Sequence, residues 1–279
     1  MLRSGLIGRA ILASRSPWLH EQEARAQGLD LTYELVDFDN RGYPDDALAD
    51  VIADLVSRGF SGFNVTYPFK QAILPLLDRL DESASLVGAV NTVAIGQDGL
   101  TGHNTDMSGF RESFESGLPG ADLTNVLQIG AGGAGSAVAV ALLTLGTANL
   151  TIADLDRDRA RDLTDRLASI RPDARMDAIA VDDVAVASFS GILNASPVGM
   201  AQSPGAPIPT ADLRPAQWIA DIVYFPLETA LLRDARARGC ATLDGSGMAI
   251  NQAALAFEII NGRDADVNRM RASFAAAVG

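Results

Sequence analysis

The sequence predicts an α/β fold in two domains, and three observations carry this prediction. The chain has 279 residues, close to twice the roughly 150 residues of a typical domain. Apolar residues make up 48% of the chain and charged residues 20%, which is the composition of a globular protein with a substantial core. Short strand-like runs alternate with amphipathic helical stretches, the pattern of a parallel sheet covered by helices.

The first hundred residues contain four predicted strands and three predicted helices. The strands are expected at 5–7, 32–38, 62–65 and 89–95, and the helices at 17–27, 44–58 and 70–77. The sequence Gln97-Asp98-Gly99 is a turn signal. A hairpin between 91–95 and 100–102 is therefore expected to close this region.

A second series of strands and helices begins near Leu123. Its strands are expected at 125–129, 149–153, 178–181, 191–194, 218–222 and 241–243, and its helices at 136–145 and 157–170. The residues from 248 onward are expected to form one or two helices. This order is typical of a nucleotide-binding sheet.

The charge and the single cysteine exclude several classes of protein. A formal net charge of −13 repels phosphate backbones and anionic lipids, so neither nucleic acid nor a membrane is an expected partner.

Cys240 is the only cysteine, which fits a cytoplasmic protein and an ordinary thiol. With one cysteine and two histidines, no catalytic metal is expected. The longest apolar stretch, 137–145, is far shorter than the ~20 residues of a membrane span.

The glycine pattern Gly130-x-Gly132-x-x-Gly135 follows a predicted strand and opens a predicted helix. Such glycines let the backbone approach a pyrophosphate, whose charge sits on the amides at the helix N-terminus. Asp154 ends the next predicted strand, where a carboxylate binds ribose hydroxyls. The alternative is a plain glycine turn with Asp154 capping its own helix. We interpret the pattern as a dinucleotide site.

Asp154 also indicates which dinucleotide binds. A carboxylate accepts hydrogen bonds from both ribose hydroxyls of NAD but repels the 2′-phosphate of NADP. NAD is therefore the expected cofactor, with NADP the weaker one. Arg157, Arg159 and Arg161 follow closely, and a guanidinium could tolerate the phosphate. The preferred interpretation of Arg157 and Arg161 is an exposed helix face paired with neighbouring aspartates.

Lys70 lies in the first turn of a predicted helix that follows Pro68. The positive end of a helix disfavours the protonated, ammonium form of lysine. An amine at this position releases its proton more readily, as a proton-transferring group must. A solvated surface lysine is the alternative. Two nearby stretches, 88–92 and 102–106, place amides and hydroxyls at strand ends, where α/β proteins build binding sites. Asp106 is expected to hydrogen-bond a substrate hydroxyl and to hold Lys70.

Ser14 and Ser16 precede Pro17 at the mouth of the first predicted helix. Their hydroxyls offer a seat for a carboxylate, and helix capping is the compatible alternative.

Together these stretches resemble the shikimate dehydrogenase family, and especially its NAD-linked quinate/shikimate dehydrogenase branch. The resemblance runs nearly from end to end. The motifs that carry it are Leu6-Ile7-Gly8, Ser14-x-Ser16-Pro17, Asn64-Val65-Thr66-x-Pro68-x-Lys70, Gly88-Ala89-Val90-Asn91-Thr92, Asn104-Thr105-Asp106, the glycine loop, Asn194-Ala195-Ser196-Pro197-Val198-Gly199-Met200, Asp221-x-x-Tyr224 and Asp244-Gly245-x-Gly247-Met248-x-x-x-Gln252.

The resemblance implies a role for each matching residue. Lys70 and Asp106 would be the catalytic pair. The substrate carboxylate would be held by Ser14, Ser16 and Tyr224, and its ring hydroxyls by Thr66, Asn91 and Gln252. The cofactor pyrophosphate would lie on Gly130, Ala131, Gly132, Gly133 and Ala134, and the nicotinamide would be bordered by Ile222, Gly245 and Met248.

The resemblance also implies a domain plan. Residues 1–105 would form an N-terminal α/β substrate-binding and catalytic domain, completed by C-terminal helices at 246–279. Residues 106–245 would form a Rossmann-type NAD-binding domain, separated from the first by a cleft.

The sequence departs from NADP-specific members of the family at the ribose position. They carry Asn-Arg-Thr where this chain has Ala153-Asp154-Leu155, which supports NAD. In the NAD-linked branch an arginine matches Arg159, so this residue is expected to contact the cofactor. Quinate-using members often carry threonine at the position of Ser16, so the serine favours shikimate. Related acids, including an amino analogue of shikimate, stay open.

The resulting interpretation is an NAD-dependent oxidoreductase of shikimate-pathway or quinate metabolism. It would interconvert a small cyclohexene or cyclohexane carboxylate, shikimate or quinate, with its 3-dehydro form, as a monomer or homodimer. A non-catalytic NAD-binding sensor on the same fold and a dehydrogenase for an unrelated small acid are the alternatives. His103 is expected to be a packing or surface residue, His20 a surface residue, and 269–271 a helix face.

Overall fold

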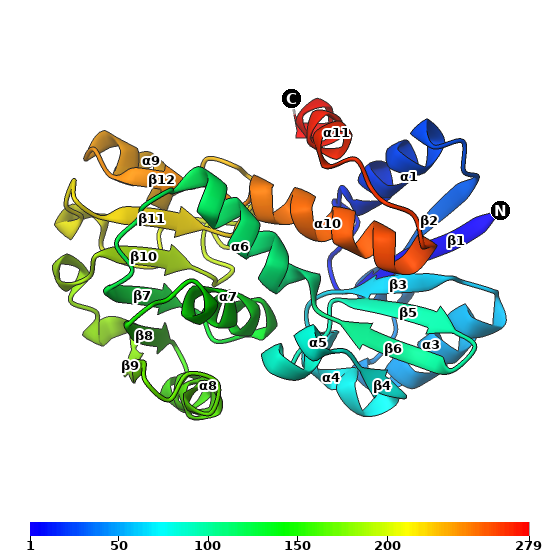
Figure 1. The fold of residues 1–279 in the computed structure, drawn as a ribbon, viewed down its shortest axis with the longest axis horizontal. Helices are drawn as coiled ribbons and strands as arrows, with labels where there is room; N and C mark the ends of the chain where they lie inside the picture. Colours follow the sequence, from blue (N-terminus) through cyan, green and yellow to red (C-terminus); the bar gives the residue numbers. More distant parts are fainter. Residues whose placement is uncertain (279) are drawn as a thin grey trace. The chain divides into compact units, whose positions relative to one another are not determined.

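The computed structural model describes residues 1–278 and divides the chain into two compact units (Figure 1). The first unit combines Met1–Thr105 with the chain from Ile250 onward, and the second comprises Asp106–Ala249. The chain leaves the first unit once and returns to it once.

The first unit contains a mixed six-stranded sheet in the order β2-β1-β3-β5-β6-β4. Strand β1 pairs in parallel with β2 and β3, whereas β5 is antiparallel to both β3 and β6. The expected hairpin is therefore confirmed, and it makes this sheet mixed rather than parallel. The strands are β1 (Leu2–Gly8), β2 (Leu31–Asp37), β3 (Gly62–Val65), β4 (Arg79–Leu80), β5 (Thr92–Gly96) and β6 (Gly99–His103).

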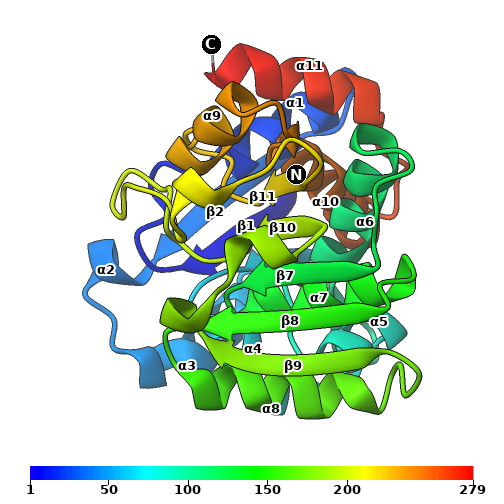
Figure 2. The ribbon, with the colours of Figure 1, turned by 90° about the vertical axis from the view of Figure 1, so that its left-hand side faces the viewer.

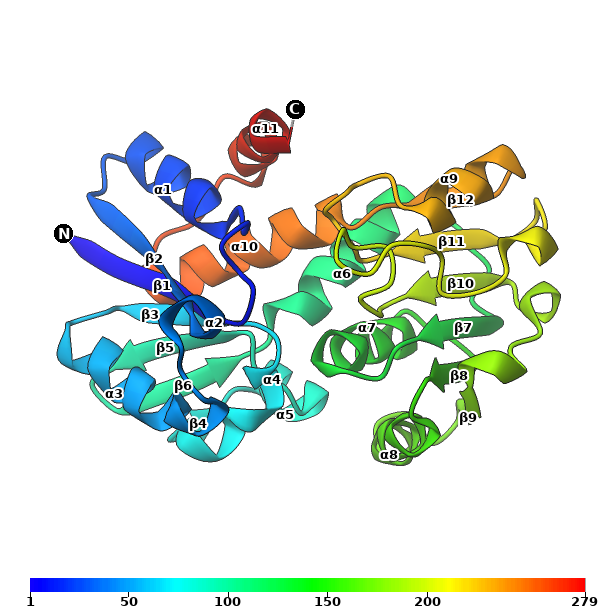
Figure 3. The same cartoon turned by 180° about the vertical axis from the view of Figure 1, so that it is seen from behind.

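Five helices of the first unit connect these strands, and two more come from the C-terminal part of the chain. They are α1 (Ser16–Ala26), α2 (Phe38–Arg41), α3 (Leu48–Ser57), α4 (Phe69–Ala72), α5 (Glu82–Val87), α10 (Ser246–Asn261) and α11 (Val267–Val278). Helix α11 lies beside α1, as Figures 1 and 3 both show.

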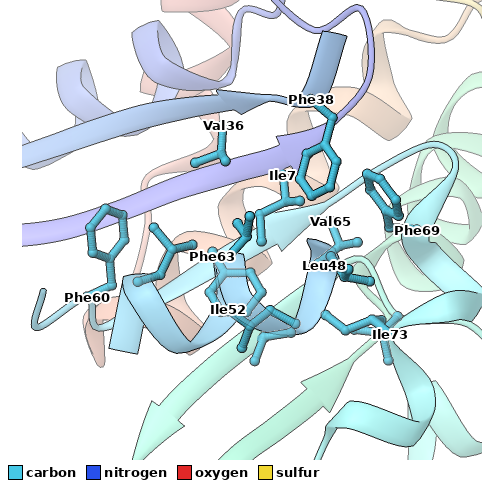
Figure 4. Close-up of a cluster of buried hydrophobic side chains, with 14 of the residues drawn as sticks. Ile7, Val36, Phe38, Leu48, Ile52, Phe60, Phe63, Val65, Phe69 and Ile73 are labelled. Carbon is cyan, nitrogen blue, oxygen red and sulfur yellow. The ribbon is translucent and has the colours of Figure 1, made fainter. Parts of the chain in front are cut away.

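Alternate residues of the first sheet face two different helical layers. Ile7 and Val36 point into a buried cluster with Leu48 and Ile52 of α3 (Figure 4). Their strand neighbours face the opposite layer, where Leu6 packs with Ile11 and Tyr33. This period of two is what a strand buried on both faces requires.

The second unit contains a six-stranded parallel sheet in the order β12-β11-β10-β7-β8-β9. Figure 2 shows β7, β8 and β9 side by side, with α8 next to them. The strands are β7 (Asn125–Ile129), β8 (Asn149–Asp154), β9 (Arg175–Ala180), β10 (Gly191–Asn194), β11 (Trp218–Asp221) and β12 (Ala241–Leu243), and the helices are α6 (Thr105–Gly117), α7 (Gly133–Thr144), α8 (Arg157–Ala168) and α9 (Ala230–Ala237).

Both faces of the second sheet are covered. Ile219 of β11 lies in a buried cluster with Leu231 and Leu232 of α9. The preceding residue, Trp218, points the other way and meets Phe114 of α6 edge to face, with 4.9 Å between the ring centroids. Helices on both sides of a parallel sheet are the arrangement of a doubly wound fold.

Two predicted elements differ from the structure for local reasons. The predicted helix 70–77 is only α4 followed by a single 3-10 turn at Leu74–Leu76, because Pro75 lacks an amide hydrogen and disfavours the α conformation of the residue before it. The predicted strand 89–95 begins only at Thr92, because α5 occupies the preceding segment and ends at Gly88 with φ +66°. Helices α2, α5, α6 and α9 were not predicted.

The prediction that His20 is a surface residue is wrong. The residue is 1% exposed, and its ring lies 4.6 Å from that of Tyr33 and 6.0 Å from that of Phe257. Burial lowers the pKa of the imidazole to about 3, so His20 is neutral at physiological pH.

The expected helix face at 269–271 is also only partly exposed, because Met270 is fully buried. Cys240, which was expected to be an ordinary, partly buried thiol, is buried at 7% exposed. Within residues 1–278, no helix combines the length and apolarity needed to cross a membrane.

Candidate functional site

Lys70 is the second residue of α4, in the short connection that follows β3. The backbone on both sides of it is held firmly. The Phe69 amide donates to the Thr66 carbonyl at 2.9 Å, and the Lys70 carbonyl accepts from the Val90 amide at 2.8 Å. Phe69 itself is buried in the core. These bonds hold Thr66 and the half-buried Lys70 next to the loop that precedes β5.

Asn91, Thr105 and Gln252 form one hydrogen-bonded cluster in the first unit. The Asn91 amide nitrogen donates to Thr105 Oγ1 at 2.9 Å and lies 3.5 Å from Gln252 Oε1. In return, Asn91 Oδ1 accepts the Thr105 backbone amide at 2.8 Å. The structure thus brings together Asn91 and Gln252, which are 161 residues apart in the chain.

Tyr33 of β2 and Asn64 of β3 connect to this cluster by hydrogen bonds, although β1 lies between their strands. The Tyr33 hydroxyl donates to Asn64 Oδ1 at 2.8 Å. The amide group of Asn64 then donates to the Asn91 carbonyl at 3.1 Å and to Thr92 Oγ1 at 2.9 Å. Sequence reasoning missed Tyr33 altogether. The only available signal was a polar Asn64 inside an otherwise apolar strand.

Ser14 and Ser16 lie together at the N-terminus of α1. Ser14 Oγ accepts the Ser16 amide at 3.2 Å, and the two hydroxyl oxygens are 3.1 Å apart. The N-cap of α1 is Arg15, and α1 has no side-chain capping hydrogen bond, so neither serine caps the helix as the capping alternative expected. Both side chains are half-buried and lie where the helix dipole favours a negative ligand.

The glycine loop of the second unit joins β7 to α7. Gly130 has φ +102°, and a Cβ there would lie 2.8 Å from the Ala195 carbonyl. Gly135 is equally constrained, because a Cβ would lie 2.4 Å from the Gly130 carbonyl oxygen. Gly132 is different: a Cβ there would meet no atom within 4 Å. The first two glycines serve the packing of the chain, whereas Gly132 leaves the backbone at the start of α7 open.

Asp154 links the end of β8 to this loop. Its Oδ2 accepts the Ala131 amide at 2.8 Å, and its Oδ1 accepts the Asp156 amide at 3.0 Å. Asp154 does not cap its own helix, because the N-cap of α8 is Asp156. The structure therefore argues against the alternative interpretation of Asp154.

The arginines that follow Asp154 are exposed on α8. Arg161 pairs with Asp158 at 3.3 Å, which is the exposed helix-face arrangement expected for it. Arg159 lies in the first turn of α8, where its backbone amide donates to the Asp156 side chain at 3.3 Å. Leu155 is 89% exposed beside them.

Asp221 lies at the end of β11 and organises the segments around it. Its Oδ1 accepts from Asn194 Nδ2 and from the Val223 amide, both at 3.0 Å, and its Oδ2 accepts from Thr229 Oγ1 at 2.7 Å. Burial raises the pKa of this carboxyl group to about 6 although these donors oppose the shift.

The remaining residues expected at the cofactor follow β11 and β12. Gly245 packs on the backbone of Ile222, since a Cβ on Gly245 would lie 2.5 Å from the Ile222 carbonyl oxygen. Met248, in the first turn of α10, is buried. The structure thus places Ile222 and Gly245 side by side at the carboxyl end of the sheet.

Asp106 lies in the first turn of α6, where the helix dipole stabilises a carboxylate, and it is 5% exposed. Burial and the charge of Asp106 both raise the pKa of the Tyr224 hydroxyl above its usual value of 10. In the described part of the chain, no group of three or more His, Cys, Asp or Glu residues could hold a metal ion.

The second unit has the features of a Rossmann-type dinucleotide-binding unit. The first strand of its parallel sheet leads through a glycine loop into a helix, and an acidic residue ends the neighbouring strand. Together with the other α/β unit, which carries the lysine and amide cluster, this unit defines a two-domain oxidoreductase. The profile described as "Shikimate dehydrogenase substrate binding domain" matches residues 6–93, and "Shikimate 5'-dehydrogenase C-terminal domain" matches residues 245–273. The chain belongs to the shikimate dehydrogenase family.

Three relatives illustrate this membership. A quinate/shikimate dehydrogenase (NAD(+)) of Corynebacterium efficiens is 48% identical over 274 residues, covering 97% of this chain and 96% of the relative. A shikimate dehydrogenase (NADP(+)) of Streptomyces avermitilis is 47% identical over 277 residues, covering 99% and 95%. The structure of quinate dehydrogenase from Corynebacterium glutamicum in complex with NAD superposes with a TM-score of 0.91 at 43% identity, covering 99% of each chain.

Proposed function

We propose that this protein is an NAD-dependent dehydrogenase that interconverts shikimate, and also quinate, with the corresponding 3-dehydro acids. Lys70 would exchange the proton of the reacting hydroxyl, and Asp106 would be its acidic partner. When bound, NAD supplies the hydride acceptor at nicotinamide C4, and the chain supplies orientation and proton transfer.

The observation that carries this proposal is the identity of residue 70. Of the 22 lysine and arginine residues in the chain, Lys70 is the only lysine. Arginine stands at every other lysine-or-arginine position, and it forms surface ion pairs such as Arg9–Asp39 and Arg161–Asp158. A guanidinium stays protonated, whereas an amine can release and regain a proton. The one lysine of the chain lies on the short helix beside Thr66 and the Asn91 loop, where a proton-transferring group is needed.

The substrate groups would be recognised by the surrounding polar residues. We assign the carboxylate to Ser14, Ser16 and Tyr224, because hydroxyl donors and the N-terminus of α1 suit an anion. We assign the ring hydroxyls to Thr66, Asn91 and Gln252. The buried amide of Asn91 and the half-buried amide of Gln252 are held by the hydrogen bonds of their cluster. Their fixed orientations let them discriminate between hydroxyl configurations. The local donors explain how a chain of net charge −13 can bind an anion.

The cofactor would be held by the second unit. We assign the pyrophosphate to the backbone of Gly130, Ala131, Gly132, Gly133 and Ala134, since Gly132 leaves that backbone open and the N-terminus of α7 favours negative charge. Asp154 and Arg159 would bind the adenosine ribose, and Asp154 favours NAD over NADP. Ile222, Gly245 and Met248 would border the nicotinamide.

Two features of this proposal need a direct comparison of substrates and cofactors. Ser16 favours shikimate over quinate, and an amino analogue of shikimate would fit the same donors. The named relatives use either NAD(+) or NADP(+), so the choice depends on the residues around Asp154. With a single, buried cysteine, a reducing cytoplasm is the proposed compartment.

The test is the initial rate of reduced-cofactor formation with shikimate, quinate and the amino analogue, each with NAD and with NADP. We expect turnover of shikimate with NAD at a kcat/KM at least tenfold above that with NADP. NAD binding by calorimetry without any turnover of these acids would contradict the proposal and favour a non-catalytic sensor.

A further inference from the structure

Asp37 is a buried carboxylate at the end of β2, outside the groups assigned above. It is 2% exposed, and its two oxygens serve two different segments. Oδ1 accepts the Asp39 and Asn40 amides at 3.0 and 3.3 Å, which caps the four-residue helix α2. Oδ2 accepts the Ile11 amide at 2.7 Å, across 26 residues of chain. One oxygen therefore completes a local cap, and the other reaches the turn that follows β1.

The turn after β1 has an unusual backbone at Ala10. With φ +52°, Ala10 is the only non-glycine residue of positive φ in the described chain, a conformation that is strained for an L-residue. The Ile11 amide donates to Asp37 Oδ2 at 2.7 Å, and the neighbouring Ala10 amide also helps to lower the pKa of this carboxyl group. Two successive amides turned toward one anion form a concave anion-binding site. In this protein an internal carboxylate occupies that site and holds the turn in place.

The turn leads by continuous hydrogen bonds to the two serines. The Ile11 carbonyl accepts the Ser14 amide at 2.8 Å. Ser14 Oγ in turn accepts the Ser16 amide and contacts the Ser16 hydroxyl. The side chain of Ile11 is buried against Leu6, so the turn is anchored at Ile11 by both packing and the Asp37 hydrogen bond.

We propose that Asp37 is a positioning residue of the carboxylate subsite: by holding the Ala10–Ile11 turn, it orients the hydroxyl groups of Ser14 and Ser16 toward the substrate carboxylate. This inference rests on the proposed function for the identity of the ligand. Asp37 does not touch the substrate and acts only through the backbone of the turn. Burial raises the pKa of Asp37, but the hydrogen bonds from backbone amides lower it by more than burial raises it. The pKa of Asp37 therefore lies below its usual value. The group is ionised at neutral pH.

The variant Asp37→Ser separates the two roles of the side chain. Serine is a good N-cap residue, so it keeps an acceptor for α2, but its single oxygen cannot also serve the turn. Asp37→Asn is the second variant, used if Asp37→Ser loses its folded circular dichroism spectrum. Asp50→Asn, at an exposed position of α3, is the matched control.

Steady-state kinetics with NAD would compare shikimate with its methyl ester, which lacks the negative charge. We expect Asp37→Ser to raise KM for shikimate about tenfold while kcat changes less than twofold. KM for the ester should change less than twofold, and Asp50→Asn should leave all values unchanged. An equal rise in KM for acid and ester, or no rise for either, would show that Asp37 has a merely structural role and would overturn the proposal.

Amide hydrogen exchange tests the anchor without any substrate and therefore does not depend on the proposed function. The amides of Ile11, Ser14 and Ser16 should exchange at least tenfold faster in Asp37→Ser, and at the wild-type rate in Asp50→Asn. Unchanged protection of these amides would contradict the proposal even in an active enzyme. Wild-type protein that turns over no acid would instead contradict the proposed function, and the exchange data would still decide whether Asp37 holds the serine turn.

Discussion

The carboxylate of Asp154 accepts a hydrogen bond from the backbone amide of Ala131 across 2.8 Å. This bond joins the end of β8 to the glycine loop. The charge that we assign to ribose recognition therefore also shapes the loop that we assign to the pyrophosphate. Substitutions of Asp154 must consequently be chosen so that loss of charge is separated from loss of the loop contact.

We expect Asp154→Asn to narrow the preference for NAD over NADP by about tenfold in kcat/KM, because the amide keeps an acceptor for Ala131 but no longer repels the 2′-phosphate. Asp154→Ala should also narrow the ratio and should weaken both cofactors, because the loop loses its contact. The measurement is kcat/KM for both cofactors at saturating shikimate. Asp158→Asn, on the exposed side of α8, is the control. A cofactor ratio that does not change in Asp154→Asn would count against the ribose role.

Much of this fold could be predicted from the sequence, because its buried strands are short apolar runs with clear boundaries. The buried strands at Gly62–Val65, Asn125–Ile129 and Gly191–Asn194 begin and end at the predicted residues. The more exposed strand at Ala241–Leu243 does so as well. The glycine pattern predicted the turn into α7, because the backbone angles at Gly130 leave little choice of residue.

The features that could not be predicted depend on contacts between distant parts of the chain. His20 follows the exposed Trp18 on a helix of mixed composition, and only the packing of Tyr33 and Phe257 against it explains its burial. The bond from Tyr33 to Asn64 crosses 31 residues, and no local pattern indicates it. Asp37 likewise looks like an ordinary helix cap, and its second partner, Ile11, becomes visible only in the structure.

We expect Lys70→Ala to lower kcat by about 10² to 10⁴, the range usual for loss of a general acid–base. Lys70→Arg should lower kcat similarly, because it keeps the charge but cannot release a proton. Gln71→Ala, at the exposed neighbouring position, should retain wild-type turnover. Full activity of Lys70→Arg would show that residue 70 acts only as a cation.

The single lysine also makes a chemical test possible. Reductive methylation can modify only one side-chain amine in this chain, at Lys70, besides the N-terminus. We expect methylation of Lys70, followed by peptide mass spectrometry, to proceed in parallel with loss of activity. Shikimate together with NAD should slow both. Loss of activity that follows methylation of the N-terminal peptide rather than of the Lys70 peptide would assign the inactivation to the N-terminus instead.

Asp221 predicts a specific pH dependence of stability. Its pKa is about 6 in the folded protein against an ordinary value of 3.8, so between these pH values the folded chain binds more protons than the unfolded chain. The contribution of Asp221 to the free energy of unfolding is therefore fully present below about pH 4 and is lost as the pH rises to about 6. The loss amounts to at most ~3 kcal/mol. Asp221→Asn keeps the shape of the side chain and removes its titration.

Urea unfolding at pH 5 and pH 7 measures this effect. Relative to Asp221→Asn, the wild-type protein should be more stable at pH 5 than at pH 7, because the variant lacks the titrating group. Asp182→Asn, an exposed acid in the same unit, controls for the general effect of removing a charge. A wild-type-to-variant difference that stays constant between the two pH values would contradict the raised pKa.

An ion pair joins Arg269 of the C-terminal helix α11 to Glu23 of α1. From this pair we expect α11 to contribute directly to the stability of the first unit. The Glu23 side chain is fully buried, and Arg269 donates to both of its oxygens, at 2.7 and 2.8 Å. Burial alone would raise the pKa of Glu23, but hydrogen bonds from Arg269, the Asp266 amide and Gln27 hold it below its usual value. Removing the guanidinium leaves a buried carboxylate that has lost its cation.

We therefore expect Arg269→Ala to lower the free energy of unfolding clearly more than a surface substitution does, because it leaves the buried Glu23 carboxylate without its cation. Arg271→Ala, two residues away on the exposed side of the same helix, should change it by less than about 0.5 kcal/mol. Replacing both partners, in Glu23→Gln with Arg269→Ala, should recover part of the loss, because no buried charge remains. Chemical denaturation of the three variants measures these differences. Equal effects of Arg269→Ala and Arg271→Ala would mean that α11 is held on α1 by its apolar residues, such as Met270, and not by the ion pair.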